Sequence, residues 1–191
     1  MDIFSAIQAA DVEAVRTLVD ADPSAAAARN DAGLSPVLAA TYRHQHEIVA
    51  ILLAARPSLD VLDAAAVGDT ARLAELLDAE PEAVNAYSPD GFFPLALAAH
   101  FRQPAAVAFL LDRGADVHQA AHNAMAVQAL HAAVAGRDYE STKLLLEAGA
   151  DPNAVQHGGY TPLMAAERNN DTPTIELLLR YGASGARATT S

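Results

Sequence analysis

The fold is decided by a short motif that is clearest near the C-terminus, where residues 159–166 read Gly-Tyr-Thr-Pro-Leu-Met-Ala-Ala. Residues 33–40 read Gly-Leu-Ser-Pro-Val-Leu-Ala-Ala, and residues 91–99 read Gly-Phe-Phe-Pro-Leu-Ala-Leu-Ala-Ala. Each copy places Pro before an apolar residue and ends in Ala-Ala. Such self-similarity along a chain is the signature of a repeat architecture.

A second signature, three consecutive apolar residues, follows fourteen positions after the first apolar residue of a copy, as at residues 144–146. Six equivalent first positions can be aligned in this way, two of them in degenerate copies. They are Ile3, Val37, Val61, Leu95, Leu130 and Leu163, at steps of 34, 24, 34, 35 and 33 residues. We number the corresponding units one to six.

The motif has a physical explanation. Ser35 or Thr161 can cap a helix whose first residue is Pro, where a missing N–H costs nothing. Gly149 suits the left-handed residue that ends a second helix. Each unit therefore predicts a helix, a tight turn, an antiparallel helix and a projecting loop, which we call a finger. Leu110 and Leu145 should be buried between layers, since single units cannot bury their apolar faces alone.

The step near 33 residues, the tripeptide at 161–163 and the stretch Leu-Leu-Leu-Glu-Ala-Gly-Ala-Asp-Pro-Asn-Ala at 144–154 resemble the ankyrin repeat. The resemblance implies an all-α solenoid of six stacked helix pairs over residues 1–184, with a C-terminal tail at 185–191. It also implies that a partner protein binds along the concave face, and that His131 has a structural hydrogen-bonding role.

The short step between units two and three predicts a missing finger. Leu53 precedes Val61 by only eight residues, whereas nineteen separate Leu111 from Leu130. This link can join antiparallel helices but is too short for a finger, so the concave side should be open above the small residues 66–67. Phe93 stands where unit six has its capping Thr; it either packs or binds something.

Composition excludes several classes of function. The chain has 191 residues, no Cys and a net charge of −12, which argues against thiol chemistry and against binding to nucleic acid or anionic lipid. No secretory signal or membrane-length apolar run is visible, so the cytoplasm is expected. The Ala- and Arg-rich, Lys-poor usage is typical of a GC-rich bacterial genome.

Catalytic and metal motifs are not found. His44 and His46 are two apart but lack a third ligand at suitable spacing, and no His-Glu-x-x-His sequence follows. Ser35 and Ser88 do not lie in a Gly-x-Ser-x-Gly sequence. We expect no catalytic residues, no bound metal and no cofactor.

What remains is a binding surface, with partner contacts expected at Tyr42, Arg43, Tyr87, Phe92, His100, Phe101, Arg102, Tyr160, Arg168 and Asn169. Within this set, Tyr42, Tyr87, His100 and Phe101 are predicted to form one exposed concave patch flanked by two arginines. The alternative is that Tyr42 and Phe101 turn inward to fill space around small alanines.

The sequence thus predicts a non-enzymatic scaffold that binds another protein. A second hypothesis is a regulatory or inhibitory subunit acting on a neighbouring enzyme or toxin, in which the acidic stretch 60–90 meets a basic target. A third, a metal-dependent enzyme using His44 and His46, is the weakest.

Overall fold

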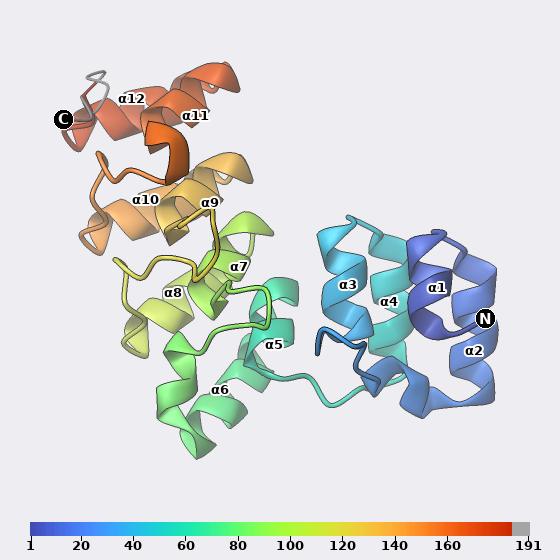
Figure 1. Cartoon of the computed structure of the whole chain (residues 1–191). Coiled ribbons are helices and arrows are strands. Elements are labelled where there is room, and N and C mark those ends of the chain that lie inside the picture. The colour runs from blue at the N-terminus through green and yellow to red at the C-terminus, as the bar shows by residue number, and fades with distance from the viewer. Residues whose placement is uncertain (185–191) are drawn as a thin grey trace.

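The computed structural model describes residues 1–184 as twelve α-helices in antiparallel pairs (Figure 1). The pairs are α1 (Ile3–Gln8) with α2 (Val12–Ala21), α3 (Pro36–Tyr42) with α4 (His46–Ala54), α5 (Val61–Val67) with α6 (Thr70–Ala79), α7 (Pro94–His100) with α8 (Pro104–Asp112), α9 (Ala129–Ala135) with α10 (Tyr139–Glu147), and α11 (Pro162–Arg168) with α12 (Thr172–Arg180). Short 3-10 helices are η1 (Pro23–Ala27), η2 (Pro81–Asn85) and η3 (His157–Gly159). The expected tail lies outside the described residues.

The helix starts follow the predicted capping chemistry. The hydroxyl of Ser35 accepts a hydrogen bond from the Leu38 amide at 2.9 Å, and that of Thr161 accepts one from Met164 at 3.3 Å. Asp69 caps α6 in the same way. Capping residues with oxygen side chains satisfy amides that the first helical turn leaves free.

Two second helices start with glutamine instead. Neither Gln45 nor Gln103 caps its own helix; each reaches back to the preceding unit. Gln45 donates to the Ile7 carbonyl at 2.8 Å, and Gln103 donates to the Ala66 carbonyl at 3.5 Å. These side chains tie unit two to unit one and unit four to unit three.

The core is a row of buried leucines from the second helices. Leu110 and Leu145 are both fully buried, as predicted, and so are Leu52, Leu73 and Leu178. Phe93 is also fully buried and makes no capping hydrogen bond, so it packs in the core rather than binding a partner.

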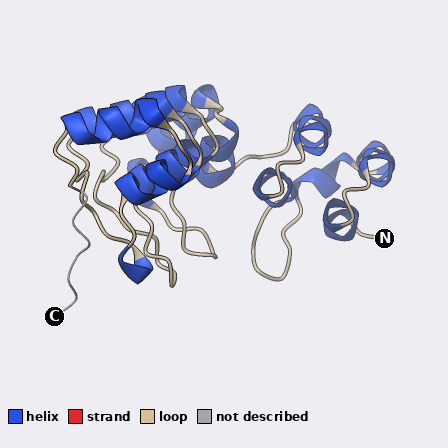
Figure 2. Ribbon diagram, turned by 90° about the horizontal axis from the view of Figure 1, so that it is seen from above, coloured by secondary structure: helices blue, strands red, loops and turns tan. Residues whose placement is uncertain are grey.

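Four fingers project from one side of the helix stack, at residues 28–35, 86–93, 117–128 and 152–161 (Figure 2). Residues 55–60 instead run directly from α4 to α5, which confirms the missing finger. Because no finger stands between them, the first finger reaches the second: a Cβ on Gly33 would lie 3.1 Å from the Pro89 ring.

The solenoid opens at this link. The second helices α6, α8, α10 and α12 pack in succession, and α2 packs on α4, but the described α4 and α6 do not pack on each other in this way. The first helices α3 and α5 stay in contact. Figure 1 therefore shows two blocks at an angle, an N-terminal block (α1–α4) and a C-terminal block (α5–α12).

Candidate functional site

A groove of about 340 Å³ lies along the first helices of units four to six and is bordered by their fingers. Its side chains come from α7, α9 and α11, from three fingers and from the end of α3. They are Tyr42, Phe92, Ala96, Leu97, His100, Met125, Val127, His131, Ala132, Ala135, Gln156, Ala165 and Arg168. We call this hollow the groove; most of its lining is apolar.

The groove exists because small residues recur along the first helices. Ala96, Ala132 and Ala165 leave room where larger side chains would fill the concave side. The last residues of α3, α7, α9 and α11, Tyr42, His100, Ala135 and Arg168, all line it. Of the ten predicted contact residues, four line this hollow, namely Tyr42, Phe92, His100 and Arg168, and the other six do not.

An aromatic cluster, comprising Tyr42, His44, Phe92, His100 and Phe101, borders the groove. The Tyr42 ring lies 5.8 Å from that of Phe101 and 6.3 Å from that of Phe92, centroid to centroid. Offset and edge contacts at such separations are favourable. The cluster joins unit two to unit four across the buried alanines of α5.

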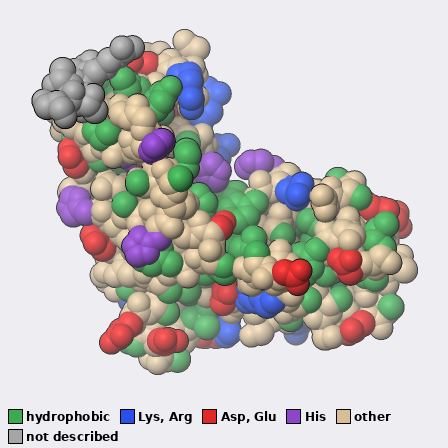
Figure 3. All heavy atoms as spheres, in the orientation of Figure 1, with side chains coloured by type: hydrophobic (Ala, Val, Ile, Leu, Met, Phe, Trp, Pro, Cys, Tyr) green, Lys and Arg blue, Asp and Glu red, His purple; other side chains and the backbone are tan. Residues whose placement is uncertain are grey.

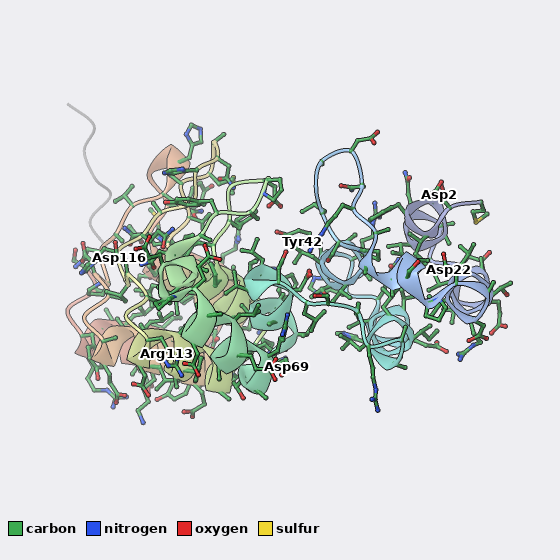
Figure 4. All side chains as sticks on the ribbon, turned by 90° about the horizontal axis from the view of Figure 1, so that it is seen from below. Asp2, Asp22, Tyr42, Asp69, Arg113 and Asp116 are labelled. Atoms are coloured by element: carbon green, nitrogen blue, oxygen red, sulfur yellow. The ribbon has the colours of Figure 1, made fainter. Side chains whose placement is uncertain are left out.

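Tyr42 lies between the two blocks (Figure 4). Its ring is half-buried against the core, as is that of Phe101, so both pack together rather than stand as separate exposed walls. Burial, and next the neighbouring Asp90 carboxylate, raise the pKa of the Tyr42 hydroxyl. Tyr42 thus stays protonated and helps hold the blocks together.

Tyr87 does not belong to the aromatic cluster, and the prediction of one patch containing it is wrong. Its ring stacks on His122 of the next finger at 3.8 Å and meets Phe93 edge-on. Its hydroxyl donates to the Ala120 carbonyl at 3.0 Å. Tyr87 therefore braces two fingers, with 37% of its surface exposed.

The other predicted contact residues differ in their surroundings. Arg43, Arg102 and Arg168 are exposed, and so is Tyr160 on the last finger. Asn169 is half-buried and its side chain donates to the Val134 carbonyl at 3.3 Å. Asn169 thus joins units five and six, a structural role that its position alone did not reveal.

Sequence reasoning missed Met125, which lines the groove with 51% of its surface exposed. It lies at the end of the finger that carries two extra residues, and its carbonyl accepts a hydrogen bond from the amide of His157 at 3.0 Å. The two extra residues of this finger were the feature of the sequence that could have pointed to Met125. His131 also lines the groove; its ring lies 3.1 Å from the Ala154 carbonyl, consistent with the expected structural bond.

A second hollow, which we call the notch, occupies the opening between the blocks. It has a volume of about 480 Å³ and includes the expected residues Ala66 and Val67. Its remaining lining is Thr41, His44, His46, Val49, Leu53, His100, Phe101, Arg102, Gln103, Ala135, Gly136 and Arg137. These residues come from units two to five, from the ends of their helices and from the turns that join paired helices. Figure 3 shows His side chains and basic side chains, which here are arginines, along its rim.

The acidic stretch 60–90 is largely engaged within the protein. Asp60 pairs with Arg29 at 2.9 Å, Glu75 with Arg72 at 2.8 Å and Asp78 with Arg113 at 2.7 Å. Asp63 is buried, Asp69 caps α6, and Asp90 accepts from Ser88. Glu80 and Glu82 are exposed, and Glu75 and Asp78 keep 68% and 70% of their side-chain surface exposed. The second sequence hypothesis therefore keeps only part of the acidic stretch for a basic partner.

His44 and His46 both lie at the notch, yet they do not form part of a metal-binding group. In the part of the chain that is described, no three His, Asp or Glu side chains are placed to hold one ion. The His44 ring instead lies 6.4 Å from that of His100 and 6.1 Å from that of Phe101. Over residues 1–184, no helix combines the length and the apolarity needed to cross a bilayer.

A bent solenoid of helix pairs, with fingers and a groove along its first helices, defines the class of helical repeat proteins. The family model for ankyrin repeats (3 copies) matches residues 61–156 and 119–189, and the chain belongs to this family. The match begins at unit three. Units one and two are recognised as part of the solenoid from their antiparallel helix pairs and from the packing of α3 on α5.

Several curated proteins are similar to the chain. The B-cell lymphoma 3 protein homolog of Mus musculus is 35% identical over 119 residues, covering 61% of the chain. Ankyrin repeat and SOCS box protein 16 is 44% identical over 86 residues, or 41% of the chain, and RelA-associated inhibitor is 37% identical over 62 residues, or 32%, both from the same organism.

The chain spans 26%, 18% and 8% of these three proteins, so the likeness covers a minor part of each. All three are animal proteins, and the predicted bacterial origin finds no support in them.

Proposed function

We propose that this chain is a non-enzymatic module that binds a segment of another protein in the groove. The groove itself carries the proposal, because an apolar hollow is where a partner's side chains gain most from leaving water. One of the relatives bears the name of an inhibitor associated with a protein, which fits binding as the mode of action.

The partner proposed is a protein rather than a nucleic acid or a membrane, since the net charge of −12 opposes contact with phosphates. We propose the cytoplasm as the location. The exposed Met125 would supply an apolar contact at the centre of the interface, and Arg168 a polar one at its edge.

This function is tested by using the immobilised chain to capture proteins from the source cell. The proteins captured by the Met125→Ala variant are compared with those captured by the Leu179→Ala variant. Both side chains are 51% exposed, but Leu179 lies on α12, away from the groove. Loss of the captured protein with Met125→Ala alone is expected. Equal capture by both variants, with unchanged folding, would remove the groove from consideration.

A further inference from the structure

The lining of the notch is opposite in charge to the rest of the molecule. Its ionisable side chains are His44, His46, His100, Arg102 and Arg137, and it contains no carboxylate. The whole chain, by contrast, carries twice as many acidic as basic residues, 24 against 12. A positive hollow on an acidic protein favours an anionic ligand over the cationic one that the total charge would attract.

The two notch arginines contribute little to holding the fold together. Arg102 and Arg137 are both exposed, and in residues 1–184 neither forms an ion pair, whereas Arg29, Arg72 and Arg113 each pair with a carboxylate. Arg137 gives one hydrogen bond, to the Asn169 carbonyl at 3.2 Å. Most of the guanidinium donors in the notch are therefore free for a ligand.

The chain presents these groups from equivalent places. His44, Arg102 and Arg137 occupy the same left-handed position in the helix–helix turns of units two, four and five, with φ of 55°, 61° and 57°. The intervening unit has Gly68 there, and the side chain of Gln103 lies over it. The row of these side chains is thus interrupted at unit three, where Gln103 covers the glycine, and the two arginines of units four and five are left side by side in sequence order.

The floor of the notch is apolar. Leu53 from α4, Val67 from α5 and Phe101 are half-buried there, so each offers some surface to a ligand. The notch also shares His100 and Ala135 with the groove. A chain segment that leaves the groove would therefore pass directly into the notch.

We propose that the notch binds an acidic segment of the partner protein. Carboxylates of the segment pair with Arg102 and Arg137, which can hold them through two parallel hydrogen bonds each. A neighbouring apolar side chain enters between Leu53, Val67 and Phe101. This inference rests on the proposed protein-binding function and adds the chemistry that the partner must carry.

A random dodecapeptide library displayed on phage, selected against the full chain, tests the inference. Selected peptides should be rich in Asp and Glu around an apolar residue. Their synthetic forms should bind Arg102→Ala/Arg137→Ala at least about tenfold more weakly than the unmodified chain. The matched control is Arg56→Ala/Arg180→Ala, which removes the same charge from two exposed arginines outside both hollows. It should stay within about twofold.

The lysine variant Arg102→Lys/Arg137→Lys keeps the charge and should retain part of the affinity, which separates recognition from misfolding. Neutral or basic peptides, or equal affinity in both double alanine variants, overturn the inference. If Met125→Ala weakens the peptides while the notch variant does not, the groove proposal stands and the notch proposal fails. If neither variant changes affinity, both proposals fail.

Discussion

At the scale of single residues, Asp63 is the most unusual group in the described structure. It is 1% exposed, at the junction of the two blocks, where the Ser35 hydroxyl donates to it and Arg29 lies 3.6 Å away. Burial, followed by the charge of Asp60, raises its pKa from the ordinary 3.8 to about 6. The bond from Ser35 and the charge of Arg29 oppose that rise only in part.

This carboxyl makes the stability of the protein depend on pH in a defined direction. Between about pH 4 and 6 the folded chain holds a proton on Asp63 that the unfolded chain has lost. The free energy of unfolding should therefore fall by about 3 kcal/mol as pH rises through this window, and stay low above it. Urea unfolding of Asp63→Asn at several pH values should lack this fall, whereas the exposed control Asp20→Asn should keep it. A profile shared by all three proteins would contradict the assignment.

At the scale of helices, the start of α7 shows how packing can outweigh capping. Phe93 replaces the capping residue and is fully buried beneath Tyr87. A cap contributes about 1 kcal/mol, whereas truncating a buried Phe costs about 3–5 kcal/mol.

Phe93→Thr should therefore destabilise the protein by about 2–4 kcal/mol even though it restores a cap. Gln128→Thr is the control. Gln128 precedes α9 without capping it, and its side chain makes one exposed hydrogen bond, to the His118 carbonyl at 3.1 Å, so the gained cap and the lost bond should leave stability within about 1 kcal/mol of the unmodified chain. Chemical denaturation of both variants gives the two values. A stabilising Phe93→Thr would show that its ring contributes little.

The layer of second helices depends on its central leucines. Leu145 is fully buried, and Leu145→Ala should lower the free energy of unfolding by about 2–5 kcal/mol through lost burial and a cavity. Leu179→Ala, on an exposed position of the next second helix, should change it by less than about 1 kcal/mol. Equilibrium denaturation decides, and a small loss for Leu145→Ala would mean that the helix register is wrong.

Local sequence predicted the elements well because their causes are local. Ser35, Thr161 and Asp69 cap the helices that they precede, and the short link after Leu53 leaves no room for a finger. Contacts between fingers were not predictable in this way. The partner of Tyr87 is His122, 35 positions away, and depends on how the neighbouring finger folds. The burial of Asp63 likewise depends on the angle between blocks.

At the scale of the whole molecule, the two blocks are held by few features. They are the contact of α3 with α5, the aromatic cluster, the contact of Gly33 with Pro89 and the ionic group around Asp63. The described α4 and α6 do not add the side-by-side packing that the other second helices make. In a solenoid, stability is a sum of neighbour interfaces, so this interface is the weak one.

Phe101→Ala should therefore loosen the N-terminal block selectively. The substitution removes the ring that contacts both Tyr42 and His44. Hydrogen exchange followed by mass spectrometry should show faster exchange in residues 3–54 and little change beyond residue 129. Tyr181→Ala, an exposed aromatic near the C-terminus, is the control. Uniform acceleration along the chain would show that the molecule opens as one unit.

The link at 55–60 separates two parts of the chain that match each other at a spacing of two units. Residues 58 positions apart are of the same type at Asp11 and Asp69, Pro23 and Pro81, Gly33 and Gly91, Pro36 and Pro94, and Gln45 and Gln103. The 3-10 helices η1 and η2 and the two backward-reaching glutamines obey the same spacing. Duplication of one pair of units would leave this two-unit spacing, with the fingerless link as its seam. Each further duplication of a pair would add another fingerless link, and with it another opening between blocks. A solenoid that grows by pairs would therefore bend at regular intervals, whereas one that grows by single repeats would curve evenly.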